Sequence, residues 1–110
     1  MIHAKFFRQE DRLVGFEFSG HADYAEAGYD IICSAVSSLS QTAMLGITQV
    51  ACVPADWSVK DSGKLFCRVK DDITRQQREQ VSLLTETLKL GIESISEAYP
   101  GYLKISIKEV

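Results

Sequence analysis

The sequence predicts an α+β domain in which two helices pack on one face of a mostly antiparallel sheet. Three observations support this fold class. The chain has 110 residues, which is typical of a single domain, here taken to span 1–110. The hydrophobic pattern changes along the chain in the order β-β-α-β-β-α-β. Two helices among five strands are most economically placed in one layer over the sheet.

The first two strands are expected at residues 2–7 and 13–19. In the second strand, apolar and polar residues alternate over 14–18, the period-2 pattern of a strand with one buried face. A polar turn between the strands predicts a hairpin, which ends at Gly20. Residues 20–30 have no usable period, so we expect a long loop there, and long ordered loops are often functional.

A charge-free segment from Ile31 to Ala55 predicts the first helix, and Pro54 closes it. Its apolar stripe consists of Val36, Leu39, Ala43, Ile47 and Val50. Eight polar but uncharged residues in this segment argue against a transmembrane span. A helix without charge on any side is either central in the domain or shared with a second subunit, and the sequence leaves both alternatives open.

A second hairpin is expected to join residues 57–60 to residues 64–69, with Leu65, Cys67 and Val69 on its buried face. The second helix follows, with a capping box at its start in the sequence Thr74-Arg75-Gln76-Gln77. Its apolar stripe consists of Val81, Leu84, Leu88, Ile92, Ile95 and Tyr99. Pro100 and Gly101 end this helix, and residues 103–108 alternate as a last strand.

Composition excludes several classes of function. Apolar residues make up 45% and charged residues 25%, as in an ordinary globular domain. The net charge of −3 and the absence of a Lys/Arg cluster in the sequence disfavour direct nucleic-acid binding. The three cysteines contain no Cys-x-x-Cys pair, which argues against a disulfide framework and a thiol-rich zinc site. No signal-peptide pattern begins the chain, so we expect a cytoplasmic protein without a cofactor or membrane contact.

Residues 19–37 form the most unusual stretch of the chain. His21 follows the second predicted strand, and Cys33 lies in the first turn of the charge-free helix. Asp30 is expected to be the N-cap, which makes Cys33 the third helical residue. Open N–H groups and the helix dipole favour the thiolate there. A thiolate with an imidazole on a neighbouring loop is the arrangement that a cysteine acyl-transfer enzyme needs.

Each reactive residue of this stretch has an expected role. Cys33 attacks a carbonyl carbon, while His21 stabilises the thiolate and then protonates the leaving amine. N–H groups of the first helical turn, including that of Cys33, receive the oxyanion. Ser37 lies one turn after Cys33 and orients the thiolate or the imidazole. Gly20 and Gly28 let the loop turn and a substrate backbone approach.

Simpler interpretations fit the other reactive residues. A cysteine is most often a small buried apolar residue, and Cys52 and Cys67 have apolar neighbours that fit this interpretation. His3 shares a strand face with Lys5 and is expected at a solvated edge. A metal site is disfavoured because its ligands are chemically mixed and match no common spacing. Those ligands are His21, Asp23, Asp30 and Cys33.

Two short motifs in this stretch occur together in a known family. The first motif is Gly20-His21-Ala22, and the second runs from Gly28 through Asp30, Ile31, Ile32, Cys33, Ser34, Ala35 and Val36 to Ser37. This combination resembles the signature of the ribosomal-processing cysteine protease family, Prp, and the resemblance extends over the whole chain in length and element order. Ile32 and Ser34 are mild departures, since family members often have Val before the cysteine and Ala after it.

The resemblance implies a homodimeric bacterial endopeptidase of the cytoplasm. The family removes a short N-terminal extension from ribosomal protein number twenty-seven of the large subunit. Its cleavage site follows apolar and aromatic residues and precedes basic ones, which suits an acidic enzyme. The family's catalytic pair corresponds to His21 and Cys33. Its substrate loop corresponds to a segment that includes Ala22, Asp23, Tyr24, Gly28 and Tyr29.

Two other functions stay open on the sequence alone. One is a non-catalytic ribosome-associated assembly module of the same fold, for which Cys33 would be unreactive towards thiol reagents at neutral pH. The other is a nucleic-acid-binding α+β domain, for which RNA affinity would depend steeply on salt.

Overall fold

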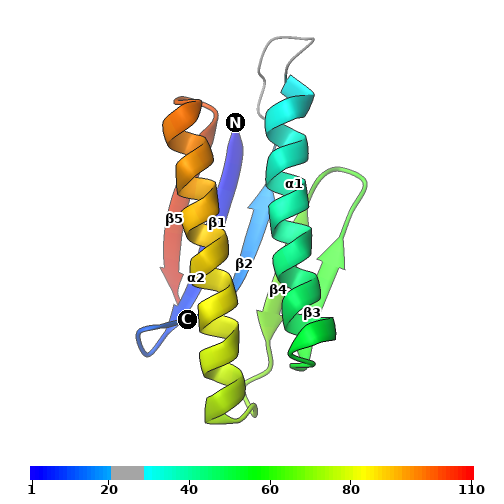
Figure 1. Ribbon diagram of the computed structural model, residues 1–110, viewed down its shortest axis with the longest axis vertical. Coiled ribbons are helices and arrows are strands. Elements are labelled where there is room, and N and C mark those ends of the chain that lie inside the picture. Colours follow the sequence, from blue (N-terminus) through cyan, green and yellow to red (C-terminus); the bar gives the residue numbers. More distant parts are fainter. Residues whose placement is uncertain (21–28) are drawn as a thin grey trace.

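The computed structural model describes residues 1–20 and 29–110, with only the backbone for residues 29 and 30. Two helices lie side by side in one layer over a five-stranded sheet (Figure 1). The strands are β1 (Ile2–Gln9), β2 (Arg12–Ser19), β3 (Ala55–Val59), β4 (Leu65–Val69) and β5 (Leu103–Glu109), and the helices are α1 (Tyr29–Leu45) and α2 (Arg75–Ala98).

The sheet has the strand order β3-β4-β2-β1-β5. Strand β1 pairs with β5 in parallel, and the other neighbouring strands are antiparallel. The predicted element order, the mostly antiparallel sheet and the single helical layer are therefore confirmed.

The β1–β2 hairpin is tighter than predicted. Only Glu10 and Asp11 connect the two strands, with φ angles of 51° and 66°. Two successive residues in the left-handed region match the twist of paired strands, so both strands extend further toward the turn. Phe6 pairs with Phe16 across the hairpin, and both side chains are fully buried. Together they form the centre of the core between the sheet and the helices.

Helix α1 ends earlier than predicted, well before Pro54. Its α-helical part stops at Leu45, and one π-helical turn continues to Val50. Cys52 then has a φ of 54°, in the left-handed region that ends many helices. The charge-free pattern continues past this point because the connection to β3 is itself uncharged, so composition alone did not mark the boundary.

The buried stripe of α1 is rotated relative to the predicted one. Leu39 and Val50 are 39% and 83% exposed, although both belong to the predicted stripe. The buried side chains are Ile32, Val36, Ser40, Met44 and Ile47. Ser40 can be buried because its hydroxyl donates a hydrogen bond to the Val36 carbonyl oxygen at 2.8 Å. A count of apolar residues does not detect a buried serine of this kind.

Helix α2 begins as predicted. The Thr74 hydroxyl accepts from the Gln77 N–H at 3.0 Å, and the Gln77 side chain accepts from the Thr74 N–H at 2.9 Å. These are the two bonds of a capping box. The buried residues of α2 are Val81, Thr85, Leu88 and Ile92. Gly91 allows close approach to α1, since a Cβ there would lie 3.2 Å from the Leu39 Cδ1 atom.

By length and composition alone, the segment Ile31–Val50 is apolar enough to cross a membrane. In this fold one side of the segment packs into the core, as the central helix of a globular domain does. Its outer side is exposed and carries no charge. The structure therefore leaves this outer side available to a partner.

Candidate active site

Gly20 ends β2 in a backbone conformation that glycine adopts most readily. Its φ is 84°, and a Cβ at this position would collide with the carbonyl oxygen of Met1. The chain leaves the sheet at this point, beside the start of β1. The close approach to Met1 gives a physical reason for glycine at the turn predicted there.

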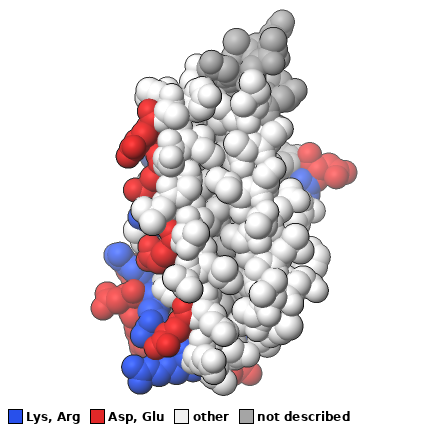
Figure 2. Space-filling model, viewed as in Figure 1, with Lys and Arg blue, Asp and Glu red and all other residues white. Residues whose placement is uncertain are grey.

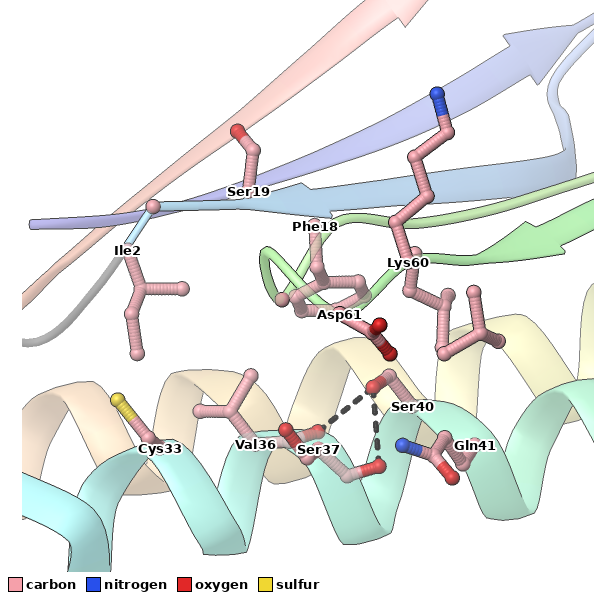
Figure 3. A pocket seen from close by; sticks show the side chains of 14 residues that line it. Ile2, Phe18, Ser19, Cys33, Val36, Ser37, Ser40, Gln41, Lys60 and Asp61 are labelled. Atoms are coloured by element: carbon pink, nitrogen blue, oxygen red, sulfur yellow. Dashed lines mark hydrogen bonds between the residues drawn. The ribbon is translucent and has the colours of Figure 1, made fainter.

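Cys33 is partly buried and lies near the start of α1. In Figure 3 its sulfur points from the helix toward the sheet, on the side where Ile2 lies. Ser37 follows one helical turn later, is exposed, and lines the same pocket as Cys33. The Ser37 carbonyl oxygen accepts a hydrogen bond from the Ser40 hydroxyl at 3.2 Å. The structure thus brings Cys33 and Ser37 together, as the helical spacing predicts.

The pocket beside Cys33 has a volume of about 260 Å³ and lies between α1 and the β3–β4 turn (Figure 3). Its buried floor is mainly apolar and consists of Ile2, Phe18, Val36 and Leu65 together with Ser40. Its more exposed rim includes the polar residues Ser19, Gln41, Lys60 and Asp61. The Asp61 carboxylate points toward α1, whereas the Lys60 side chain extends away from that helix. The pocket can therefore hold an apolar side chain beside a polar backbone.

Lys60 and Asp61 are pocket residues that sequence reasoning missed. Both belong to the predicted second hairpin, but nothing in the sequence places its turn near Cys33. The contact arises because β4 pairs with β2, which brings the β3–β4 turn beside the end of β2 where the pocket lies. The one signal in the sequence that could have pointed to these two residues was the polar turn itself, because binding and catalytic residues often lie on such turns.

The three cysteines occupy different environments. Cys67 is fully buried, and burial raises the pKa of its thiol to about 12, so it stays protonated at neutral pH. Cys52 is exposed beyond the far end of α1, where its thiol donates to the Gln49 carbonyl oxygen at 3.3 Å. Cys33 is the cysteine that lines the pocket. Among these three thiols, Cys33 has the position that a nucleophile requires.

The register of α1 corrects two details of the predicted site. The helix begins at Tyr29, so Asp30 lies inside the helix and is not its N-cap, and Cys33 is the fifth helical residue. In an α-helix the N–H of the fifth residue bonds to a carbonyl one turn earlier. The Cys33 N–H is therefore not one of the open N–H groups at this end. The dipole effect on Cys33 is also weaker than predicted, because it decays within the first turn.

Most of the predicted loop lies outside the described residues. This applies to His21, Ala22, Asp23, Tyr24 and Gly28, and to the side chains of Tyr29 and Asp30. The pairing of His21 with Cys33 therefore stays a prediction. The disfavoured metal site is likewise untested, since three of its four ligand side chains are outside the description. Within the described ranges, no group of three His, Cys, Asp or Glu residues is arranged to hold a metal ion.

Sequence comparisons identify relatives over nearly the whole chain. The family model for cysteine protease Prp matches residues 1–104. The ribosomal processing cysteine protease Prp of Bacillus subtilis is 26% identical over 108 residues, which cover 96% of each chain. The protein of the same name from Staphylococcus aureus is 26% identical over 102 residues, covering 90% of this chain and 91% of its own.

Solved structures show the same fold. A crystal structure of a Streptococcus mutans protein superposes with a TM-score of 0.82 at 32% identity, covering 100% of this chain and 96% of that one. Prp of S. aureus in complex with a covalently linked product peptide has a TM-score of 0.82 at 23% identity, covering 98% of this chain and 100% of its own. With a family model that matches residues 1–104 and a fold shared over the full length, this chain belongs to the cysteine protease Prp family.

Proposed function

We propose that this protease removes the N-terminal extension of ribosomal protein number twenty-seven of the large subunit. The observation that carries the proposal is the position of Cys33, the one cysteine of three that lines the pocket at the end of β2. The comparisons support ribosomal processing in general, because relatives along the whole chain bear that name. A cytoplasmic location is part of the proposal, since a reducing compartment keeps the Cys33 thiol in its active form.

The proposed reaction proceeds through a thioester. The Cys33 thiolate attacks the scissile carbonyl carbon, and the oxyanion that forms is stabilised by open N–H groups at the start of α1. His21, as imidazolium, donates a proton to the leaving amine when the C–N bond breaks. A water molecule then attacks the thioester, His21 takes up its proton, and the thiolate is released with the new carboxylate.

The pocket fits the proposed substrate in shape and polarity. Its apolar floor suits an aromatic or aliphatic side chain just before the cleaved bond. Asp61 supplies a carboxylate on the rim, which suits a basic residue after that bond. The chain's net charge of −3 favours encounter with a basic ribosomal protein.

Cleavage of the extended ribosomal protein by the purified enzyme tests this proposal. We expect one cut, after the apolar and aromatic residues of the extension, and mass spectrometry of the product reads the new N-terminus. A matched substrate with aspartate in place of the last residue before the cut should stay intact, because the pocket floor is apolar. Failure to cut the extended protein, or equal cutting of the aspartate substrate, contradicts the proposed substrate.

The outer side of the helical layer supports a homodimer, which we also propose. This uncharged helix face comprises Ile31, Ser38, Thr42 and Leu45 of α1 with Leu83, Thr87, Leu90 and Ser94 of α2. All eight residues are exposed, and Leu83 and Leu90 are 69% and 67% exposed. Figure 2 shows this face without charge, with Lys, Arg, Asp and Glu gathered mainly along one edge. Two copies that meet here would bury these apolar side chains.

A charge introduced into the uncharged helix face should dissociate the dimer. We expect Leu90→Glu to convert a particle of twice the 12.3 kDa chain mass into a monomer at micromolar concentration, because each copy would then bury a carboxylate in the interface. Sedimentation or light scattering measures this mass. Ser106→Glu, an exposed position on the other side of the sheet, is the matched control and should remain dimeric. A wild-type chain that stays monomeric contradicts the proposal.

A further inference from the structure

The sheet surface that faces away from the helices contains side chains from all five strands. We call it the open sheet face. Its members follow from the strand pairing, because paired residues point to the same side of a sheet. They form three cross-strand rows, namely Lys104, His3, Ser19; Ser106, Lys5, Glu17, Phe66, Ser58; and Lys108, Phe7, Gly15, Arg68, Asp56. Alternate residues on the same strands, such as Phe6, Phe16 and Cys67, are fully buried on the helix side.

Two further lysines join this face at the ends of β4. The Lys64 Nζ atom lies 3.9 Å from a Glu17 oxygen, and the Lys70 Nζ atom lies 2.6 Å from an Asp56 oxygen. The face then has six cations and two carboxylates, a charge of +4, whereas the whole chain has −3. The cations are Lys5, Lys64, Arg68, Lys70, Lys104 and Lys108. The fold thus gathers half of the chain's twelve Lys and Arg residues on one surface.

The two carboxylates do not neutralise this surface. Glu17 lies between Lys5 and Lys64, at 3.9 Å from each ammonium group, so one carboxylate is shared by two cations. Three cations of the face, Arg68, Lys104 and Lys108, form no ion pair with any residue in 1–20 or 29–110. Cations without an ion pair within these ranges therefore lie on two strands of the face, β4 and β5.

An aromatic side chain lies within the same surface. Phe66 is partly exposed, and its ring lies 5.8 Å from the Phe7 ring, centroid to centroid. Gly15, in the row beside Phe66, has no side chain, and a Cβ there would collide with the Cys67 carbonyl oxygen. Gly15 therefore leaves the surface beside Phe66 without a side chain at this position, and a sheet with a partly exposed ring is the kind of platform on which a nucleic-acid base stacks.

We propose that the open sheet face binds single-stranded RNA. The excess cations would contact phosphates, and Phe66 would stack on a base. The rows contain no exposed aliphatic side chain to insert into a bilayer, which disfavours a lipid surface. This proposal replaces the expectation from net charge, because the sum of −3 does not show that cations are in excess on the open sheet face. It does not depend on the proposed substrate.

Binding of a fluorescein-labelled oligouridine of about twelve nucleotides tests the proposal. Fluorescence anisotropy at about 50 mM NaCl should show binding, and a plot of log affinity against log salt should have a slope of about −2 to −3, as for three or four neutralised phosphates. The variant Lys104→Glu/Lys108→Glu should weaken binding at least about tenfold and reduce the steepness of that slope. Phe66→Leu should weaken binding several-fold with the slope unchanged, since stacking involves no counterion release.

Arg75→Glu/Lys89→Glu on α2 is the matched control, because it makes the same change in net charge away from the open sheet face. It should keep wild-type affinity within about twofold. Peptide cleavage by both double variants should equal that of the wild type, which shows that they are folded. Three results would overturn the proposal: no RNA binding at low salt, equal loss of binding in the control variant, or tighter binding to anionic phosphatidylserine vesicles than to the RNA.

Discussion

Cys33→Ala is expected to lower kcat/KM for the extended ribosomal protein by at least about 10⁴-fold, a typical loss when a covalent nucleophile is removed. Alanine leaves the helix and the pocket walls in place, but no thiolate remains to attack the carbonyl carbon. The rate of product formation, followed by mass spectrometry, measures this loss. Circular dichroism should show an unchanged fold, because Cys33 lies at the pocket and only partly inside the core.

Cys52→Ala is the matched control for this experiment, because Cys52 is exposed and lies away from the pocket. It should retain activity within about twofold of the wild type. Thiol labelling gives a second measurement, in which iodoacetamide at neutral pH should inactivate the wild type by modifying Cys33. Persistent cleavage by Cys33→Ala would eliminate the thioester mechanism, and an unreactive Cys33 would favour the non-catalytic module.

Phe16→Ala is expected to have the largest effect on stability, a loss of about 3–5 kcal/mol in the free energy of unfolding. Phe16 is completely buried on the central strand β2, and its ring centroid lies 5.9 Å from that of Phe18 in an edge-to-face arrangement. Alanine would leave a cavity at this position. Strand β2 cannot move to close it, because β2 is paired with β4 on one side and with β1 on the other. Since domains of this size are stable by only about 5–15 kcal/mol, much of the stability would be lost.

Urea unfolding, followed by circular dichroism, measures this difference. Ile107→Ala on the edge strand β5 is the control, because its side chain is already 41% exposed, and it should lose less than about 1.5 kcal/mol. A Phe16→Ala loss as small as that of the control would show that the centre of the core lies elsewhere.

Local sequence patterns predicted most of the fold because each depends on neighbouring residues. The Thr74–Gln77 capping box needs only one turn of chain, and both of its hydrogen bonds are present. The alternation from Val14 to Phe18 likewise predicted the buried face of β2. The failures occurred in α1, where Ser40 satisfies its hydroxyl inside the helix and Leu39 lies at the boundary with α2. Apolar periodicity cannot distinguish these cases, since it measures side-chain type and not hydrogen bonding.

For the site, the sequence singled out Cys33 through the residues around it. It did not locate the pocket, because Asp61 and Leu65 join Cys33 in its lining through pairing between strands that are distant along the chain. It also placed Cys33 too early in the helix, as the third helical residue, whereas Tyr29 and Asp30 are already helical. The segment that holds His21 is outside the described residues, so that part of the site stays a prediction.

The sequence by itself determined the element order, the fold class and the cysteine most suited to be a nucleophile, because periodicity, caps and motifs are local properties of the chain. Only the tertiary structure decided which side of α1 is buried, which residues surround Cys33, and how charge is distributed. A net charge of −3 is a sum over all residues, so it does not show where on the surface the charges lie. Strand pairing placed six cations on one face, and helix packing left the middle of the opposite face without charge (Figure 2). Both arrangements depend on contacts between residues far apart in the sequence.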